Sequence, residues 1–161
     1  MAIERFPPVE YADEHGLLAL GGDLEVESLL LAYSSGIFPW PLGGGALREI
    51  PWFAPPMRGV LFLKDYSPPR SLRKAERRGG FELRVNTAFR DVITNCAVAN
   101  NRPGQRGSWI TRHMVSAYTE LHQAGYAHSI ECFVGEELVG GLYGVGIGGM
   151  FAGESMFYRQ P

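Results

Sequence analysis

A single carboxylate in an otherwise uncharged stretch is the first residue whose chemistry stands out. Residues 138–158 read LVGGLYGVGIGGMFAGESMFY, and Glu154 is the only charged side chain among them. Removing an ionised carboxylate from water without a partner costs several kcal/mol. We therefore interpret Glu154 as a site residue that faces a cleft or binds a cationic group. The alternative at this point is a strand whose polar positions simply face water.

Five cations spaced at helical intervals form a second candidate site. The first four follow one another at i, i+3, i+4 and i+7, which places them on one face of a helix that starts after the prolines at 68 and 69. Such a face gains most when phosphates supply the counter-charge and bound ions are released, so we interpret it as a phosphate-binding stripe. A solvated basic face is the alternative. The five residues are Arg70, Arg73, Lys74, Arg77 and Arg78.

Composition restricts the class of protein. The 161 residues are 45% hydrophobic and 20% charged, which is typical of an ordinary globular chain of single-domain size. The formal net charge of -2 argues against a general polyanion binder, so contact with nucleic acid must come from a local patch. No apolar run approaches the length of a membrane span, and the N-terminus lacks the layout of a signal peptide. We expect a cytoplasmic protein without membrane contact.

The cysteines and histidines predict neither disulfides nor a metal site. Cys96 and Cys132 are too few and too far apart for a disulfide framework or a metal knuckle, and each lies in an apolar pattern typical of a buried thiol. The four histidines contain no HExxH or comparable pair. We expect no metal and no cofactor.

Apolar periodicity predicts an α+β fold. The first helix is expected to begin after Asp23 as its N-cap and to end at Gly36. Residues 36–59 are rich in Pro, Gly and aromatic residues and read as an ordered functional loop, although a loop folded over the core fits equally well. The further elements expected are strands over 59–64 and 81–85, helices over 87–100 and 110–124, a binding loop over 101–109, a hairpin over 129–147 and a strand over 150–158.

Four motifs together closely resemble those of the bacterial leucyl/phenylalanyl-tRNA-protein transferases, in the family's order and over nearly the whole chain. The resemblance implies transfer of Leu or Phe from an aminoacyl-tRNA to proteins with an N-terminal Arg or Lys, which marks them for degradation. It also implies a small N-terminal lobe, residues 1–58, followed by an acetyltransferase-like (GNAT-type) domain, residues 59–161. The motifs are GLLALGGDL at 16–24, LLLAYSSGIFPW at 29–40, SWITRHMVSAYTELHQAGYAHSIE at 108–131 and LVGGLYGVGIGGMFAGESMF at 138–157.

The resemblance also assigns roles to individual residues. Trp40, Trp109, Leu142 and Phe151 match the positions of the family's apolar amino-acid pocket, and Glu154 matches its carboxylate beside the substrate. Leu142 stands where some members carry methionine, which leaves the pocket apolar. The basic stripe matches the place where members bind the tRNA acceptor stem, and we expect it to lie next to the pocket. Such a pocket discriminates weakly between apolar side chains, so Met should be accepted as well.

One larger departure from the family keeps two other interpretations open. The chain stops at Pro161, before the family's Asp-x-Gln motif, so we expect a fragment that is truncated at its C-terminus. We also expect the protein to act as a monomer. A non-catalytic tRNA-binding remnant is one alternative. The other is a GNAT-like acyl-CoA transferase, because residues 144–149 superficially resemble that superfamily's pyrophosphate loop, although no Arg or Gln opens the loop.

Overall fold

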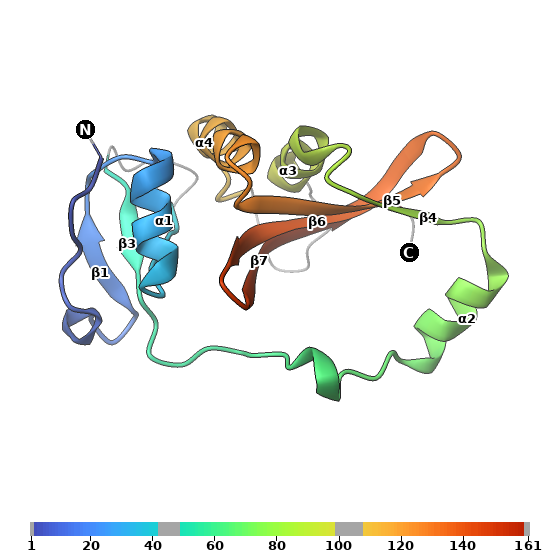
Figure 1. The fold of residues 1–161 in the computed structure, drawn as a ribbon, viewed down its shortest axis with the longest axis horizontal. Coiled ribbons are helices and arrows are strands. Elements are labelled where there is room, and N and C mark those ends of the chain that lie inside the picture. The colour runs from blue at the N-terminus through green and yellow to red at the C-terminus, as the bar shows by residue number, and fades with distance from the viewer. Residues whose placement is uncertain (1, 42–48, 99–107, 160–161) are drawn as a thin grey trace.

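Two antiparallel sheets form the frame of the molecule in a computed structural model that describes residues 2–41, 49–98 and 108–159 (Figure 1). The smaller sheet has the strand order β1-β3-β2 and the larger one the order β4-β5-β6-β7. Strands and helices follow one another without a parallel crossover, so the α+β class is confirmed. The strands are β1 (Leu17–Leu20), β2 (Phe38–Pro39), β3 (Pro51–Phe53), β4 (Glu82–Val85), β5 (Ala127–Val134), β6 (Glu137–Ile147) and β7 (Met150–Tyr158).

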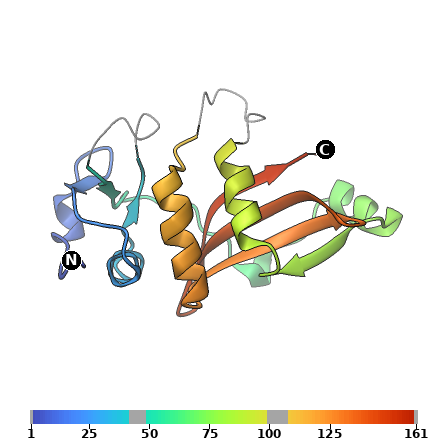
Figure 2. The same ribbon diagram turned by 90° about the horizontal axis from the view of Figure 1, so that it is seen from above.

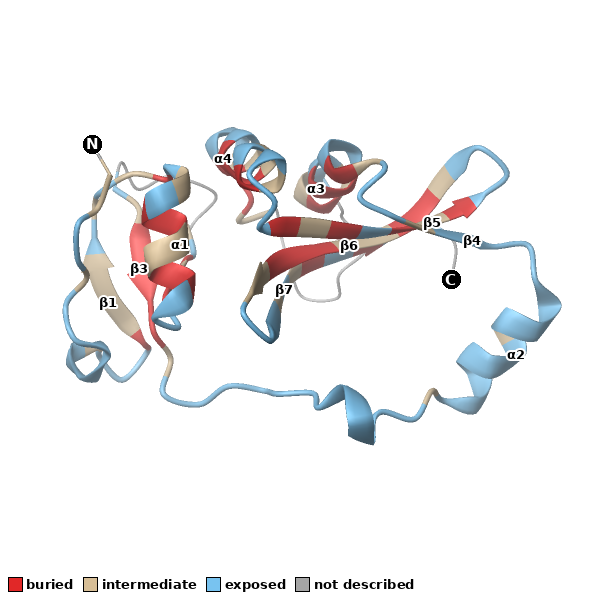
Figure 3. Cartoon of the chain, viewed as in Figure 1, coloured by how far each residue is buried: buried red, intermediate tan, exposed pale blue. Residues whose placement is uncertain are grey.

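Two helices cover one face of the larger sheet, and a third joins that layer to the smaller sheet. α3 and α4 lie side by side on the sheet, and α1 packs against α4 and β6 (Figures 1 and 2). The burial pattern follows from this arrangement, because the facing sides of these elements carry the buried residues (Figure 3). The helices are α1 (Val26–Ser34), α2 (Arg70–Arg78), α3 (Phe89–Val98) and α4 (Arg112–Gln123), with 3-10 turns at Val9–Tyr11 and Leu63–Asp65.

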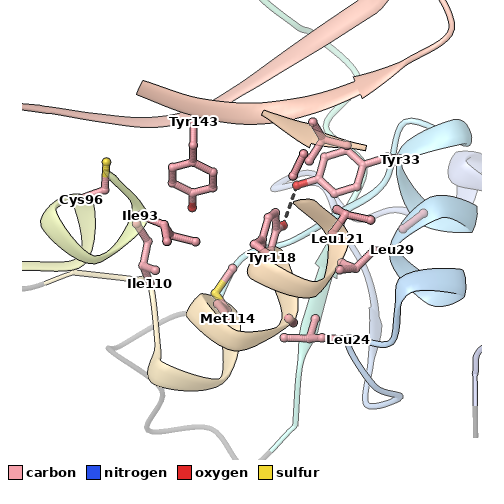
Figure 4. Close-up of a cluster of buried hydrophobic side chains, with 14 of the residues drawn as sticks. Leu24, Leu29, Tyr33, Ile93, Cys96, Ile110, Met114, Tyr118, Leu121 and Tyr143 are labelled. Carbon is pink, nitrogen blue, oxygen red and sulfur yellow. Dashed lines mark hydrogen bonds between the residues drawn. The ribbon is translucent and has the colours of Figure 1, made fainter. Parts of the chain in front are cut away.

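One hydrophobic cluster runs through both sheets. Leu29 of α1, Leu121 of α4 and Tyr143 of β6 are fully buried members of it (Figure 4). Trp52 of β3 is also a fully buried member, and its Nε1 donates to the Gly21 carbonyl at 2.8 Å. Burial of these large side chains stabilises the contact between the two parts of the chain. This shared core does not show where one domain ends and the next begins, so the boundary between residues 58 and 59 stays a prediction.

The predicted strand over 59–64 is wrong. Residues 59–62 have no regular structure, and Leu63–Asp65 forms a 3-10 turn. The side chains of Val60, Leu61 and Phe62 are 70%, 63% and 63% exposed. β-branched and aromatic residues form a strand only where a neighbouring strand accepts their backbone hydrogen bonds, and this segment lies beside no strand in the described part of the chain.

Three short strands were not predicted. β2 and β3 lie inside the segment 36–59 that the sequence indicated as a loop, and they pair through Phe38 with Phe53 and Pro39 with Trp52. β1 pairs with the other side of β3. Strands of only two to four residues, of which β2 and β3 also contain proline, give no alternating pattern, so only tertiary pairing shows them.

The start of α1 also differs from the prediction. Glu25, not Asp23, is the N-cap, because the helix begins at Val26. The Asp23 carboxylate accepts hydrogen bonds from the Glu25 backbone at 3.0 Å and from the Ser28 hydroxyl at 2.6 Å. Asp23 therefore fixes the turn that leads into the helix instead of capping it.

The polar side of β5 is its buried side. Glu131 is fully buried and accepts from the hydroxyls of Ser129 and Thr87 and from the backbone N–H groups of Thr87 and Ala88. Thr87 and Ala88 precede Phe89, the first residue of α3, where the helix dipole favours negative charge. Glu131 thus ties the start of α3 to the centre of the larger sheet.

Replacing Glu131 should destabilise the fold, because we assign this residue a structural role and no catalytic one. Glu131→Ala leaves buried donors without their acceptor, so we expect the free energy of unfolding to fall by about 2–4 kcal/mol in urea denaturation. Glu136→Ala, an exposed glutamate in the turn after β5, should change it by less than about 0.5 kcal/mol. Equal effects of the two substitutions would show that the Glu131 hydrogen bonds contribute nothing net.

Candidate functional site

Glu154 occupies a β-bulge in β7. Gly153 pairs with Gly144 and Ser155 pairs with Tyr143, so Glu154 is the extra residue between two paired positions. A bulge turns a side chain away from the direction that strand alternation would give it. Here the carboxylate reaches the tyrosines of α1 and α4, on the side of the sheet where Tyr143 packs edge-on against Tyr118 at 5.9 Å between ring centroids.

Two buried tyrosines meet beside this carboxylate. The hydroxyls of Tyr33, on α1, and Tyr118, on α4, lie 2.6 Å apart, and their rings are perpendicular with centroids 6.4 Å apart (Figure 4). The Glu154 carboxylate lies close enough to both tyrosines to raise the pKa of each, although burial is the larger cause. Burial raises the pKa of both tyrosines well above the usual value, so both keep their protons at physiological pH and can donate.

The half-buried Glu154 is poised to titrate near neutrality. Burial raises the pKa of its carboxyl to about 7, while the nearby Tyr33 hydroxyl and then the Arg58 charge act in the opposite direction. The folded state therefore holds the proton more tightly than the unfolded chain. The stability that this gives is fully present below the unfolded pKa of about 4.3 and is lost as the pH rises through about 7.

Arg58 supplies the nearby positive charge. Its guanidinium lies 4.7 Å from the centroid of the Phe38 ring and donates to the carbonyl oxygen of Gly36, at the exit from α1. Gly36 has φ +73°, a conformation that glycine adopts without steric cost. The turn that ends α1 and the arginine that faces Glu154 thus hold each other in place.

Sequence reasoning missed Tyr33, Tyr118 and Arg58 as site residues. Both tyrosines lie on the apolar stripes of their helices, a position that is typical of core residues. A usable signal was that a buried tyrosine hydroxyl requires a hydrogen-bond partner, which is rare in an aliphatic core. Nothing in the local sequence distinguishes Arg58 from the other exposed arginines.

The two predicted tryptophans do come together. The ring centroids of Trp40 and Trp109 lie 6.5 Å apart, and Trp40 also contacts Phe53 at 5.9 Å. Trp40 is 45% exposed. Trp40, Trp109, Phe53 and Phe38 therefore form an aromatic wall, in which Trp40 is exposed to solvent and Phe53 is buried.

Leu142 and Phe151 lie elsewhere on the sheet. Leu142 is paired between Ile130 and Met156, which are 39% and 65% exposed on the face turned away from α3 and α4. The ring of Phe151 covers Gly144 so closely that a Cβ at this glycine would collide with it. Among the described residues neither side chain makes a ring contact with the two indoles, so a common pocket for all four stays a prediction.

The basic stripe forms a helix, but not beside the aromatic wall. All five cations lie in α2, which buries no side chain and stands at the opposite end of the molecule from β2 and β3 (Figures 1 and 2). The expected adjacency is therefore wrong. Arg73 donates to the Pro68 carbonyl and the Ser67 hydroxyl, and no ion pair joins the five cations to another described residue.

The remaining sequence-based expectations concern thiols, metals and membranes. Cys96 is buried, whereas Cys132 is only partly buried, and burial raises the pKa of the Cys132 thiol. Within residues 2–41, 49–98 and 108–159 no group of His, Cys, Asp and Glu side chains could hold a metal ion. No helix in that part of the chain has the length and apolarity needed to cross a bilayer. Most of the predicted binding loop, residues 101–107, lies outside the described residues.

Comparison with known proteins places these features in a family. Residues 60–161 match the family profile described as leucyl/phenylalanyl-tRNA protein transferase, and residues 22–56 match the profile of its N-terminal domain. The chain is 52% identical over 158 residues to the leucyl/phenylalanyl-tRNA–protein transferase of Myxococcus xanthus, covering 98% of this chain and 66% of that protein. The enzyme of the same description from Nitratidesulfovibrio vulgaris is 52% identical over 156 residues, covering 97% and 65%.

A third relative agrees with these two. The leucyl/phenylalanyl-tRNA–protein transferase of Dechloromonas aromatica is 51% identical over 161 residues, covering 98% of this chain and 67% of that protein. The chain thus spans about two thirds of the length of the curated relatives that it matches. Both family profiles and identity over almost the whole chain confirm the resemblance seen in the motifs, and the chain belongs to the leucyl/phenylalanyl-tRNA protein transferase family.

Proposed function

We propose that this protein transfers Leu or Phe, and also Met, from an aminoacyl-tRNA to the N-terminal Arg or Lys of acceptor proteins. The transfer tags the acceptor for degradation, and we place it in the cytoplasm, where translation supplies the substrate, with the protein acting as a monomer. Membership of the family supports the reaction class. The observation that carries the chemistry is the Glu154 carboxyl, whose pKa of about 7 suits proton transfer at physiological pH.

The reaction needs one proton acceptor and no cofactor. The α-amine of the acceptor attacks the ester carbonyl carbon, a tetrahedral intermediate forms, and the bond to the ribose oxygen breaks as the amide forms. The N-terminal amine has a pKa near 8, so a usable fraction is neutral and positioning supplies much of the rate. Glu154 accepts the proton that the amine loses and returns it to the departing ribose oxygen.

The aromatic wall supports Leu and Phe as the transferred amino acids. Trp40 and Trp109 present apolar area to a Leu or Phe side chain, whereas a β-branched side chain would collide near its own backbone. A difference of one methylene gives only about 1–3 kcal/mol, which is why we include Met among the substrates. Leu142 and Phe151 belong to this proposal as further pocket residues, on the strength of their place in the family motif alone.

α2 is proposed to bind the tRNA at a distance from the reacting ester. Its cations stand in solvent and form no ion pair with another described residue, although Glu76 lies on the same helix, which leaves them available to phosphates. An acceptor stem is a duplex that extends away from its amino-acid end, so contacts at the far end of the molecule are compatible with a 3′ end at the aromatic wall. We also propose that the larger sheet with α3 and α4 is the acetyltransferase-like part of the fold.

Of the two alternative functions, the acyl-CoA transferase loses support and the non-catalytic tRNA-binding protein keeps it. Residues 144–149 span the end of β6 and the turn into β7, not a loop before a helix N-terminus, so they do not form the phosphate-binding geometry that an acyl-CoA transferase requires. A non-catalytic tRNA-binding protein remains the second candidate, because every feature of α2 would serve it. Incubation with labelled Phe-tRNA and a peptide that begins with Arg separates the two, since only the transferase labels the peptide.

Replacing Glu154 should reduce transfer and leave tRNA binding unchanged. Glu154→Gln removes the proton acceptor but keeps the shape, so we expect the single-turnover rate at pH 7.5 to fall by about a hundredfold or more. Because the buried charge is lost, the melting temperature above pH 7 should rise rather than fall. Equal losses of transfer and of filter-measured tRNA affinity would reject the assigned role.

Reversing two charges on α2 should weaken tRNA binding and lower its salt dependence. Lys74→Glu with Arg77→Glu is the suitable pair, because Arg73 holds the start of the helix. We expect the slope of log affinity against log salt to decrease by about two. Arg5→Glu with Arg90→Glu makes the same charge change at exposed sites outside α2. If both pairs alter the slope equally, α2 is only a solvated basic face.

Truncating the accessible indole should impair substrate selection. Trp40→Ala removes one side of the aromatic wall, so we expect the rates for both Leu and Phe to fall at least about tenfold per folded molecule. Active protein is counted by near-UV circular dichroism before the assay. Early melting combined with normal turnover of the folded fraction would show that Trp40 is a core residue.

A further inference from the structure

We propose that Arg58 binds the phosphate that precedes the terminal ribose of the aminoacyl-tRNA, and so holds the ester beside the aromatic wall. The inference rests on the proposed function, since it names the side chain that recognises one further part of the same substrate. It is carried by the contacts that Arg58 makes with the wall and with the end of α1, and by the donors that these contacts do not use.

Arg58 stands beside the row of rings that forms the aromatic wall. Its Cζ lies 4.7 Å from the centroid of Phe38, the Phe38 centroid lies 6.3 Å from that of Trp40, and Trp40 lies 6.5 Å from Trp109. An arginine over a ring is attracted by the negative face of the π system, an interaction that uses none of the guanidinium N–H donors. The wall thus fixes the position of this cation and leaves its hydrogen-bonding capacity intact.

Arg58 keeps donors that its own contacts do not use. A guanidinium carries five N–H groups in a planar fork. The Nη2 of Arg58 donates to the Gly36 carbonyl, the side chain is exposed, and no ion pair within the three described stretches joins it to a carboxylate. The fork is therefore anchored at one nitrogen, and its other nitrogens are left for an oxyanion, which arginine binds through two parallel hydrogen bonds.

The proposed substrate places an apolar group and a phosphate a short distance apart. In an aminoacyl-tRNA, the ester and one ribose separate the Leu or Phe side chain from the nearest phosphate. A site that holds the side chain on an aromatic wall therefore needs an anion-binding donor close to that wall. Arg58 touches the wall through Phe38 and meets this requirement. Arginine is also the side chain whose planar fork matches the geometry of a phosphate.

The basic helix cannot take this role. α2 stands at the opposite end of the molecule from β2 and β3, so its cations are remote from the Phe38 ring that Arg58 covers (Figures 1 and 2). Under the proposed function these cations contact the stem, which leaves the terminal phosphate to a separate cation. Arg58 supplies that cation from the segment between β3 and α2.

The charge of Arg58 also links the wall to the proposed proton acceptor. Burial raises the pKa of the Glu154 carboxyl to about 7, and the Arg58 charge is one of the influences that oppose this rise. A phosphate held by Arg58 thus places the terminal ribose and its ester near Glu154 as well as near the indoles.

A purely structural role for Arg58 is the alternative. Gly36 lies just past the C-terminus of α1, where the last carbonyls attract cations, so the bond from Arg58 could serve only to close the helix. The two roles differ in what they predict. A structural arginine affects every ligand of the wall equally, whereas a phosphate-binding arginine affects only those ligands that carry the phosphate.

Two substrate analogues that differ only in the phosphate separate the two roles. Both are 3′-phenylalanylamido-3′-deoxyadenosine, with an amide in place of the labile ester, and one carries a 5′-hydroxyl while the other carries a 5′-phosphate. Binding is followed by NMR through the indole N–H signals of Trp40 and Trp109, with the buried Trp52 as an internal reference. We expect the 5′-phosphate to lower the dissociation constant about tenfold or more in the unsubstituted protein.

Substitution of Arg58 should remove this gain in affinity and little else. In Arg58→Gln the phosphate should improve binding by less than about twofold, whereas the dissociation constant of the 5′-hydroxyl analogue should change by less than about threefold. Arg90→Gln, at an exposed arginine of α3, should keep the full gain. A gain that persists in Arg58→Gln, or an equal loss of affinity for both analogues, would overturn the proposal.

The outcomes also separate this inference from the proposed function. Equal binding of both analogues to the unsubstituted protein would overturn the assignment of Arg58 and leave the transferase proposal standing. Binding of neither analogue would reject the proposed pocket and the assignment with it. If Arg58→Gln fails to fold, the Nε–H signal of Arg58 in the unsubstituted protein decides. It should shift with the 5′-phosphate analogue only, and an identical response to both analogues would refute the proposal.

Discussion

Removal of a single carboxylate from bulk water is the constraint on which the site depends. Glu154 lies among tyrosine rings and sheet backbone, and this environment alone moves its pKa from that of an ordinary surface glutamate to about 7. The bulge in β7 is what brings the side chain there, and the packing of α1 against α4 closes the environment. Exposure of this one group would return it to an ordinary carboxylate with little use as a base at neutral pH.

The same packing explains why the two parts of the chain act together. Tyr33 and Arg58 come from the N-terminal part, whereas Tyr118 and Glu154 come from the C-terminal part, and one hydrophobic cluster spans both. The site is therefore built at the contact between them. The proton acceptor that we propose is therefore assembled only when the two parts of the chain pack together.

The sequence predicted well where the signal was local. The i, i+3, i+4 spacing predicted the helix that carries Arg70 and Arg77, and an isolated charge in an apolar stretch indicated Glu154, whose role as a site residue stays a prediction. Tyr33 and Tyr118 escaped because periodicity marks them as core, and the partner of each hydroxyl lies 85 positions away. The strand predicted over residues 59–64 was wrong for a related reason, because a strand needs a neighbouring strand with which it can pair. The distance between α2 and the aromatic wall is a property of the tertiary fold, which no local pattern contains.

The pH dependence of transfer tests the central claim most directly. Single-turnover transfer from Phe-tRNA to a peptide that begins with Arg would be followed from pH 5 to pH 9. The profile would be corrected for the ionisation of the peptide's own N-terminal amine. Glu154 acting as base with its raised pKa predicts an acid limb with an apparent pKa near 7 that disappears in Glu154→Gln. A limb near pH 4 to 5, or the same limb in both proteins, would contradict it.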